Sequence, residues 1–172
     1  MQDGVVLGLF GIASLVVFKW SLTIPFLSTL FSVMIVATPV FATLLTMRLR
    51  NRYVKENNCF TFSNGFLHAL FTGFYASLWV ALFTFVYLQY FDHGTIFTLY
   101  GQAIDTPQMK LYLQQSGINS ELSALSGEQG IQGVVAAMKG VGSATYAAMS
   151  LYCAIVFGPF IAAVIGLICR KN

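Results

Sequence analysis

Four long apolar runs, separated by more polar stretches, dominate the pattern of hydrophobic and polar positions along the chain. Each run approaches or exceeds the roughly 20 residues that a helix needs to cross a bilayer. We expect membrane spans over about residues 4–20, 22–47, 66–91 and 143–169. The pattern therefore predicts an all-α fold, an integral membrane four-helix bundle in which residues 1–172 form a single membrane domain.

Individual residues refine this prediction at the ends and in the middle of the spans. Lys19 and Trp20 close the first run, where their polar ends suit the lipid headgroups. A cleaved signal peptide is the alternative for this run, but Asp3 lies where such a peptide carries positive charge. Pro39 and Pro159 lie inside the second and fourth runs, and we expect each to bend its helix because proline removes a backbone hydrogen bond.

The segment between the third and fourth spans, about residues 92–142, is the one sizeable stretch that the pattern places outside the membrane. Thr106 and Pro107 make a good helix start and Gly117 a good stop, so residues 106–117 are predicted to form a short helix. Residues 120–142 carry a loose apolar face interrupted by glycines. This second stretch either lies on the membrane surface or extends the fourth helix outward. The whole segment is thus a partly helical outer loop, which acts as a lid on the bundle or as a platform for a partner.

Composition supports the membrane class. Hydrophobic residues make up 57% of the chain and charged residues only 9%, far below the roughly one quarter typical of soluble domains. The formal net charge of +3 is too small to indicate a polyanionic partner, so no nucleic acid is expected. Membrane lipids are the predicted surroundings.

Positive charge gathers between the second and third spans, where four of the nine Lys and Arg residues lie close together. We call these residues the basic cluster: Arg48, Arg50, Arg52 and Lys55. Because Lys and Arg accumulate in short cytoplasmic loops, the cluster predicts that this loop and both termini are cytoplasmic. An additional role in binding anionic lipid or a phosphorylated headgroup remains open.

Small residues recur four positions apart in three of the spans. The positions are Gly4 and Gly8 in the first span, Ala69, Gly73 and Ser77 in the third, and Gly158, Ala162 and Gly166 in the fourth. Such stripes let helix backbones approach closely in lipid, where packing drives association. They indicate either packing within this bundle or contact with a homo-oligomer or a membrane-protein partner.

Residues that could carry chemistry are sparse. The outer loop has no carboxylate pair, no His/Cys ligand cluster and no hydrolase-type Ser motif, so we predict no catalytic, cofactor-binding or metal-binding residues. Cys59, Cys153 and Cys169 are too far apart in the pattern to suggest a metal site. His68 is the one ionisable residue inside the second, third and fourth spans. It is either an interfacial, hydrogen-bonded residue or a proton-handling one.

A short motif leads from the basic cluster into the third span: Phe62, Ser63, Gly65 and Phe66, followed by Gly73. The surrounding segment, CFTFSNGFLHALFTGFYASLWVALFTFVYLQYFD, resembles the central part of an uncharacterised bacterial four-span family, domain of unknown function 4199. The order of two spans, basic link, third span, polar outer loop and fourth span is similar across nearly the whole chain. One departure is DHGTI after the third span, where we expect a proline-containing exit.

The resemblance implies a multi-pass protein of the bacterial inner membrane and carries no catalytic residues. It also implies work on the cell envelope, because genes of the family often neighbour one for a glycosyltransferase that acts on polyprenyl phosphate. Two functional classes follow, neither of them enzymatic. The first is a non-catalytic subunit or scaffold of an inner-membrane complex, related to envelope glycan or lipid. The second is a small carrier or flippase for a lipid-linked or hydrophobic solute, with bends at Pro39 and Pro159 permitting motion and the basic cluster attracting a phosphate headgroup.

Overall fold

The computed structural model describes the chain except residues 1, 58, 108–110, 113–114, 116–129 and 171–172. The described residues form helices and no strand. The helices are α1 (Gln2–Ser21), α2 (Pro25–Asn57), α3 (Phe62–Val86), the π-helix η1 (Tyr87–Asp92), α4 (Thr95–Ile104), α7 (Gly130–Gly140) and α8 (Ser143–Cys169). The predicted all-α membrane helical bundle is confirmed.

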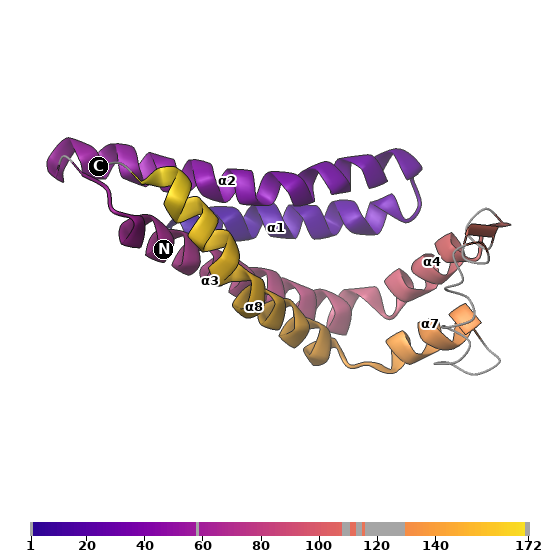
Figure 1. Ribbon diagram of the computed structural model, residues 1–172. Helices are drawn as coiled ribbons and strands as arrows, with labels where there is room; N and C mark the ends of the chain where they lie inside the picture. Colours follow the sequence, from indigo (N-terminus) through magenta and orange to yellow (C-terminus); the bar gives the residue numbers. More distant parts are fainter. Residues whose placement is uncertain (1, 58, 108–110, 113–114, 116–129, 171–172) are drawn as a thin grey trace.

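The four long helices form two arms, as Figure 1 shows. One arm is the antiparallel hairpin of α1 and α2, and the other is the pair α3 and α8. The arms meet through α3, which packs on both α1 and α8, and they diverge toward the end opposite the two termini. Both termini lie at the same end of the molecule. Among the described residues, four helices are long and apolar enough to cross a membrane: Gln2–Ser21, Pro25–Lys55, Phe62–Asp92 and Ser143–Cys169.

The second helix is longer than the hydrophobic pattern predicts. We expected the span to end near residue 47, but α2 continues to Asn57. No Gly or Pro follows Pro39 within this helix, and Arg and Lys are good helix formers, so the change to polar residues ends the apolar run without ending the helix. The basic cluster is therefore helical. Neither Pro39 nor Pro159 interrupts its helix, since α2 and α8 continue through them.

The third span has clear boundaries. Thr61 caps α3, because its hydroxyl accepts a hydrogen bond from the backbone N–H of Asn64 at 3.4 Å. Before the cap lies Phe60, which is fully buried and packs edge-on against Tyr53 of α2 with 5.8 Å between the ring centroids. At its other end the helix widens into η1 and stops at Asp92. This buried aromatic contact fixes the short connection between α2 and α3.

The segment between the third and fourth spans holds α4, which the sequence did not predict. The helix predicted over residues 106–117 lies mainly outside the described residues. Within the second predicted stretch, α7 is a separate helix that ends at Gly140, so it does not continue α8. Instead α7 packs on α4, where Gly101 lies close enough to Val135 that an added Cβ would be 3.3 Å from its side chain.

Candidate functional site

The two arms are held together by a close contact between α1 and α3 in the half nearer the termini. A Cβ added at Gly4 would lie 2.6 Å from Tyr75 Cβ, and one added at Gly8 would lie 2.9 Å from Trp79 Cβ. Gly11 faces α3 at a similarly short distance. Glycine lets the backbones approach this closely because it has no side chain to separate them.

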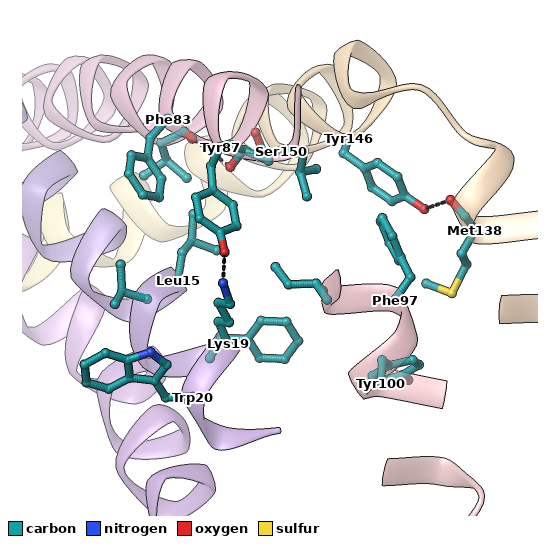
Figure 2. A pocket seen from close by; sticks show the side chains of 16 residues that line it. Leu15, Lys19, Trp20, Phe83, Tyr87, Phe97, Tyr100, Met138, Tyr146 and Ser150 are labelled. Carbon is teal, nitrogen blue, oxygen red and sulfur yellow. Dashed lines mark hydrogen bonds between the residues drawn. The ribbon is translucent and has the colours of Figure 1, made fainter. Parts of the chain in front are cut away.

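Beyond Gly11, α1 carries large residues toward α3, and a pocket of about 650 Å³ lies between the arms. We call it the side pocket. Its walls come from α1, α3, η1, α4, α7 and α8, as Figure 2 shows for the labelled side chains. The residues used below are Lys19, Trp20, Thr84, Tyr87, Tyr146 and Ser150. The pocket therefore forms where the glycine contact ends and the helices separate.

The lining of the side pocket is largely apolar, with Leu15, Phe83 and Phe97 contributing from three different helices. Phe97 of α4 contacts Tyr146 of α8 with 5.2 Å between ring centroids, and both side chains line the pocket. Trp20 lines the pocket and is 56% exposed, so the pocket also reaches the surface of the molecule. Its volume is within the roughly 300–1,000 Å³ typical of ligand sites.

A chain of three polar side chains crosses one wall of this pocket. The Lys19 ammonium donates a hydrogen bond to the Tyr87 hydroxyl, drawn as a dashed line in Figure 2. The Tyr87 hydroxyl in turn donates to Asp92 Oδ1 at 3.4 Å. This Lys19–Tyr87–Asp92 chain joins α1 to η1 at the wide end of the two arms.

Asp92 is nearly fully buried, and the turn that follows it explains how its charge is accommodated. His93 and Gly94 have φ angles of +46° and +82°, a left-handed turn that glycine adopts readily. The turn brings the start of α4 back over Asp92, whose two carboxylate oxygens accept the backbone N–H of Ile96 at 3.2 and 3.0 Å. A carboxylate is stabilised at a helix N-terminus. The DHGTI segment thus leaves the third span through a left-handed turn at His93 and Gly94, with Asp92 at the start of α4.

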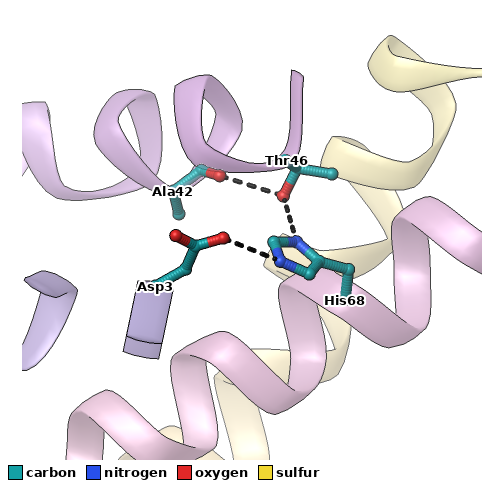
Figure 3. A network of polar contacts seen from close by, with 4 residues as sticks. All are labelled: Asp3, Ala42, Thr46 and His68. Atoms are coloured by element: carbon teal, nitrogen blue, oxygen red, sulfur yellow. Dashed lines mark hydrogen bonds and ion pairs between the residues drawn. The ribbon is translucent and has the colours of Figure 1, made fainter. Parts of the chain in front are cut away.

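A second polar group joins three spans near the termini, as Figure 3 shows. His68 Nε2 lies 3.2 Å from Asp3 Oδ2, and His68 Nδ1 lies 3.1 Å from the Thr46 hydroxyl. Thr46 is fully buried and also donates to the carbonyl of Ala42 at 3.0 Å. His68 is thus a hydrogen-bonded residue that ties α1, α2 and α3 together, with Asp3 as the partner that the sequence did not reveal.

The basic cluster lies at the same end as the termini, on the part of α2 that extends past the apolar run. Arg48, Arg52 and Lys55 are four and three residues apart and so share one side of the helix. Arg50 donates to the side chain of its neighbour Asn51 at 3.4 Å. Because the side pocket lies at the opposite end of α1, the structure does not bring the basic cluster and the pocket together.

The predicted small residues fall into two groups. Gly4 and Gly8 pack on α3, and Ala69, Ala162 and Gly166 are buried in the α3–α8 contact. Gly65, which the stripes omitted, lies against Gly166, so that an added Cβ would be 3.1 Å from Gly166 Cα. In contrast, a Cβ at Gly73 or Gly158 would meet no described neighbour within 4 Å. Ser77 is partly exposed and donates to the carbonyl of Phe74 at 2.7 Å.

In the part of the chain that the structure describes, no three His, Cys, Asp or Glu side chains gather closely enough to hold a metal ion. Cys59 and Cys153 are exposed, and Cys169 is buried.

Sequence reasoning missed the side pocket and its Lys19–Tyr87–Asp92 chain. Lys19 was interpreted as a residue at the lipid headgroups, and Asp92 as part of the polar outer loop. One signal was available: the glycines of α1 stop at Gly11, and four residues later Leu15 begins a bulkier stretch. That change predicts where two closely packed helices must separate, but it does not say which residues face each other.

Four long apolar helices around a small buried core define a multi-pass membrane protein of the helical-bundle class. The family model described as "Protein of unknown function (DUF4199)" matches residues 2–171, so the chain belongs to this family. Comparisons with curated proteins and with solved structures gave no significant match. The family resemblance seen in the sequence is thereby confirmed over nearly the whole chain.

Proposed function

We propose that this protein is a non-catalytic membrane protein that binds an amphiphilic molecule of the bilayer in the side pocket, as a small carrier or lipid-binding protein. The observation that carries the proposal is the pocket itself: about 650 Å³, apolar over most of its lining, between two arms of a membrane bundle. An apolar space reached from the membrane region favours a hydrophobic ligand over a water-soluble one. The envelope role implied by the family resemblance stays a prediction.

A lipid-retention experiment tests this function. The protein is released gently from its membrane, and bound lipids are counted and identified by native mass spectrometry. Wild type is expected to retain a bound lipid, and Ser150→Phe, which places a ring in the pocket, is expected to reduce retention at least tenfold. Ser32→Phe on the exposed side of α2 is the matched control, because both serines donate to a backbone carbonyl of their own helix. Equal retention by the two variants would contradict the proposal.

A second candidate is a non-catalytic subunit or scaffold that holds a membrane-protein partner or a second copy of this chain. Gly73 and Gly158 favour it, because the packing within the described chain does not use them. A helix from outside the chain would pack closely at such positions. If this candidate holds, Gly158→Leu abolishes cross-linking to a partner helix but leaves lipid retention unchanged.

We place the protein in the bacterial inner membrane with both termini cytoplasmic. The basic cluster supports this orientation, since it follows the apolar run of α2 at the same end as the termini.

A further inference from the structure

The charges around the side pocket indicate which amphiphile it would take. Lys19 is the one charged side chain among the described residues that line the pocket. It sits near the end of α1, with apolar lining from the same helix on one side and the exposed Trp20 on the other. A lysine at this position keeps its ammonium near polar surroundings while its stem covers apolar surface. The cation therefore marks the polar end of an otherwise apolar space.

Three hydroxyl groups that line the pocket, those of Thr84, Tyr146 and Ser150, do not compete for the same role. Thr84 donates to the carbonyl of Val80 at 2.8 Å, and Ser150 donates to that of Ala147 at 2.8 Å. Tyr146 donates to the carbonyl of Met138 at 2.7 Å. Their protons are committed to the backbone, so these groups offer a ligand only their oxygen atoms. The donors for an acidic headgroup must come from elsewhere in the lining.

Lys19 has N–H groups that the described contacts do not use. An ammonium carries three N–H groups, and the described structure uses one of them, toward the Tyr87 hydroxyl. The nearest acidic group in this chain of contacts is Asp92, which the Tyr87 phenol separates from Lys19. Both Asp92 oxygens already accept the Ile96 N–H, and the side chain is 1% exposed. Asp92 and Tyr87 therefore hold the ammonium in place, while two of its N–H groups stay available to the pocket.

From this geometry we infer that the ligand of the side pocket is an anionic amphiphile, whose apolar chain fills the pocket and whose acidic headgroup contacts Lys19 Nζ. The inference rests on the proposed function and adds the charge of the ligand and the residue that selects it. Charge-assisted hydrogen bonds from an ammonium to an acidic oxygen are stronger than those between neutral groups, so the site favours an acid over a neutral molecule of the same chain length.

Fluorescence quenching tests the inference. The chain has two tryptophans, Trp20 in the pocket and Trp79 outside it, so Trp79→Phe leaves Trp20 as the reporter. In detergent micelles this variant is titrated with a brominated long-chain fatty acid and with the neutral brominated alcohol of the same length. Trp20→Phe, which leaves only Trp79, gives the quenching that arises from partition into the micelle. We expect saturable quenching of Trp20, with the acid binding about tenfold more tightly than the alcohol.

Three lysine variants in the Trp79→Phe background assign the preference. Lys19→Gln should abolish the preference for the acid and leave alcohol binding unchanged, whereas Lys19→Arg should restore it. Lys139→Gln removes the same charge from α7, outside the side pocket, and should have no effect. Lys19 has two roles, a hydrogen bond to the Tyr87 hydroxyl and a contact with the acidic headgroup. Tyr87→Phe separates them, because it removes the hydrogen bond but keeps the ammonium. If Tyr87→Phe abolished the preference for the acid as completely as Lys19→Gln, Lys19 would act only by its hydrogen bond to Tyr87 and not by contacting the headgroup. The inference would then be overturned.

The outcomes separate this inference from the proposed function. If neither probe quenched Trp20 above the micelle level, the pocket would bind no amphiphile and both proposals would fail. If acid and alcohol bound equally, and Lys19→Gln changed nothing, only the anionic selectivity would be overturned.

Discussion

Single glycines decide how closely the helices of this protein approach one another. In α8, Gly166 faces α3 so tightly that an added Cβ would lie 3.0 Å from the backbone nitrogen of Phe66. Gly158, two turns earlier in the same helix, has open space around it. The two positions look alike in the sequence stripe, yet only one of them carries a steric requirement.

We predict that Gly166→Ala destabilises the protein and Gly158→Ala does not. Forcing extra volume into a packed contact costs about 1–3 kcal/mol. Both substitutions gain the same helix propensity, about 1 kcal/mol from Gly to Ala. The difference in stability between the two variants therefore reports the contact of Gly166 with α3. Unfolding in detergent, followed by intrinsic fluorescence, should show a lower midpoint for Gly166→Ala and an unchanged or higher one for Gly158→Ala. Equal midpoints would mean that α3 and α8 do not approach at Gly166.

At the scale of the elements, the outer segment depends on how α3 ends and α4 begins. The helix continues through η1 to Asp92, reverses at His93 and Gly94, and restarts as α4. Asp92 links the two elements because both of its carboxylate oxygens accept the backbone N–H of Ile96, one of the free N–H groups in the first turn of α4. The same carboxylate also accepts a hydrogen bond from the Tyr87 hydroxyl, so Asp92 stabilises both the start of α4 and the polar wall of the side pocket.

We predict that Asp92→Ala loosens α4 without unfolding the bundle. Losing a side-chain cap costs about 0.5–2 kcal/mol, and about 1.4 kcal/mol corresponds to a tenfold change in an opening equilibrium. Amide hydrogen exchange over residues 96–104 should therefore become about tenfold faster, while that of α3 and α8 stays the same. Thr98→Ala is the control, because the Thr98 hydroxyl donates to the carbonyl of Gly94 from an exposed position. If it accelerated exchange as much as Asp92→Ala, the carboxylate would have no special role.

At the scale of the whole molecule, the basic cluster and the side pocket lie at opposite ends. The termini and the basic cluster share one end, and the side pocket opens at the other. The hydrogen-bonded group of Asp3, Thr46 and His68 ties three helices together at the end with the termini. The arms are thus fastened at one end and diverge at the other, which is the arrangement that leaves room for a ligand.

The native cysteines provide a test of the orientation in the membrane. Cys59 is exposed just beyond α2, whereas Cys153 lies within the span formed by α8 and Cys169 is buried. With the basic cluster inside, a membrane-impermeant maleimide should label Cys59 in inverted vesicles and not in intact spheroplasts. Cys59→Ser should remove the label. Labelling in spheroplasts would show that the termini face outward and that the basic cluster does not set the topology.

The sequence by itself determined the number of spans, the all-α class and the family. The spans and the class follow from a local quantity, the length of each apolar run. The fourth span shows this best, since the predicted range 143–169 equals the bounds of α8. The helix α2 continues past the predicted end of the second span, because hydrophobicity marks where the membrane ends, while helix formation depends on backbone propensity and continues through Arg48 to Lys55.

Only the tertiary structure decided which residues meet. Asp3 lies 65 positions from His68, and Lys19 lies 68 positions from Tyr87, so no local pattern could pair them. Their contacts depend on how α1 is rotated and shifted along α3, and the Gly4, Gly8 and Gly11 contacts set that register. The lining of the side pocket likewise could not be assigned from the sequence, because the pocket is the space between helices that meet only in the folded structure.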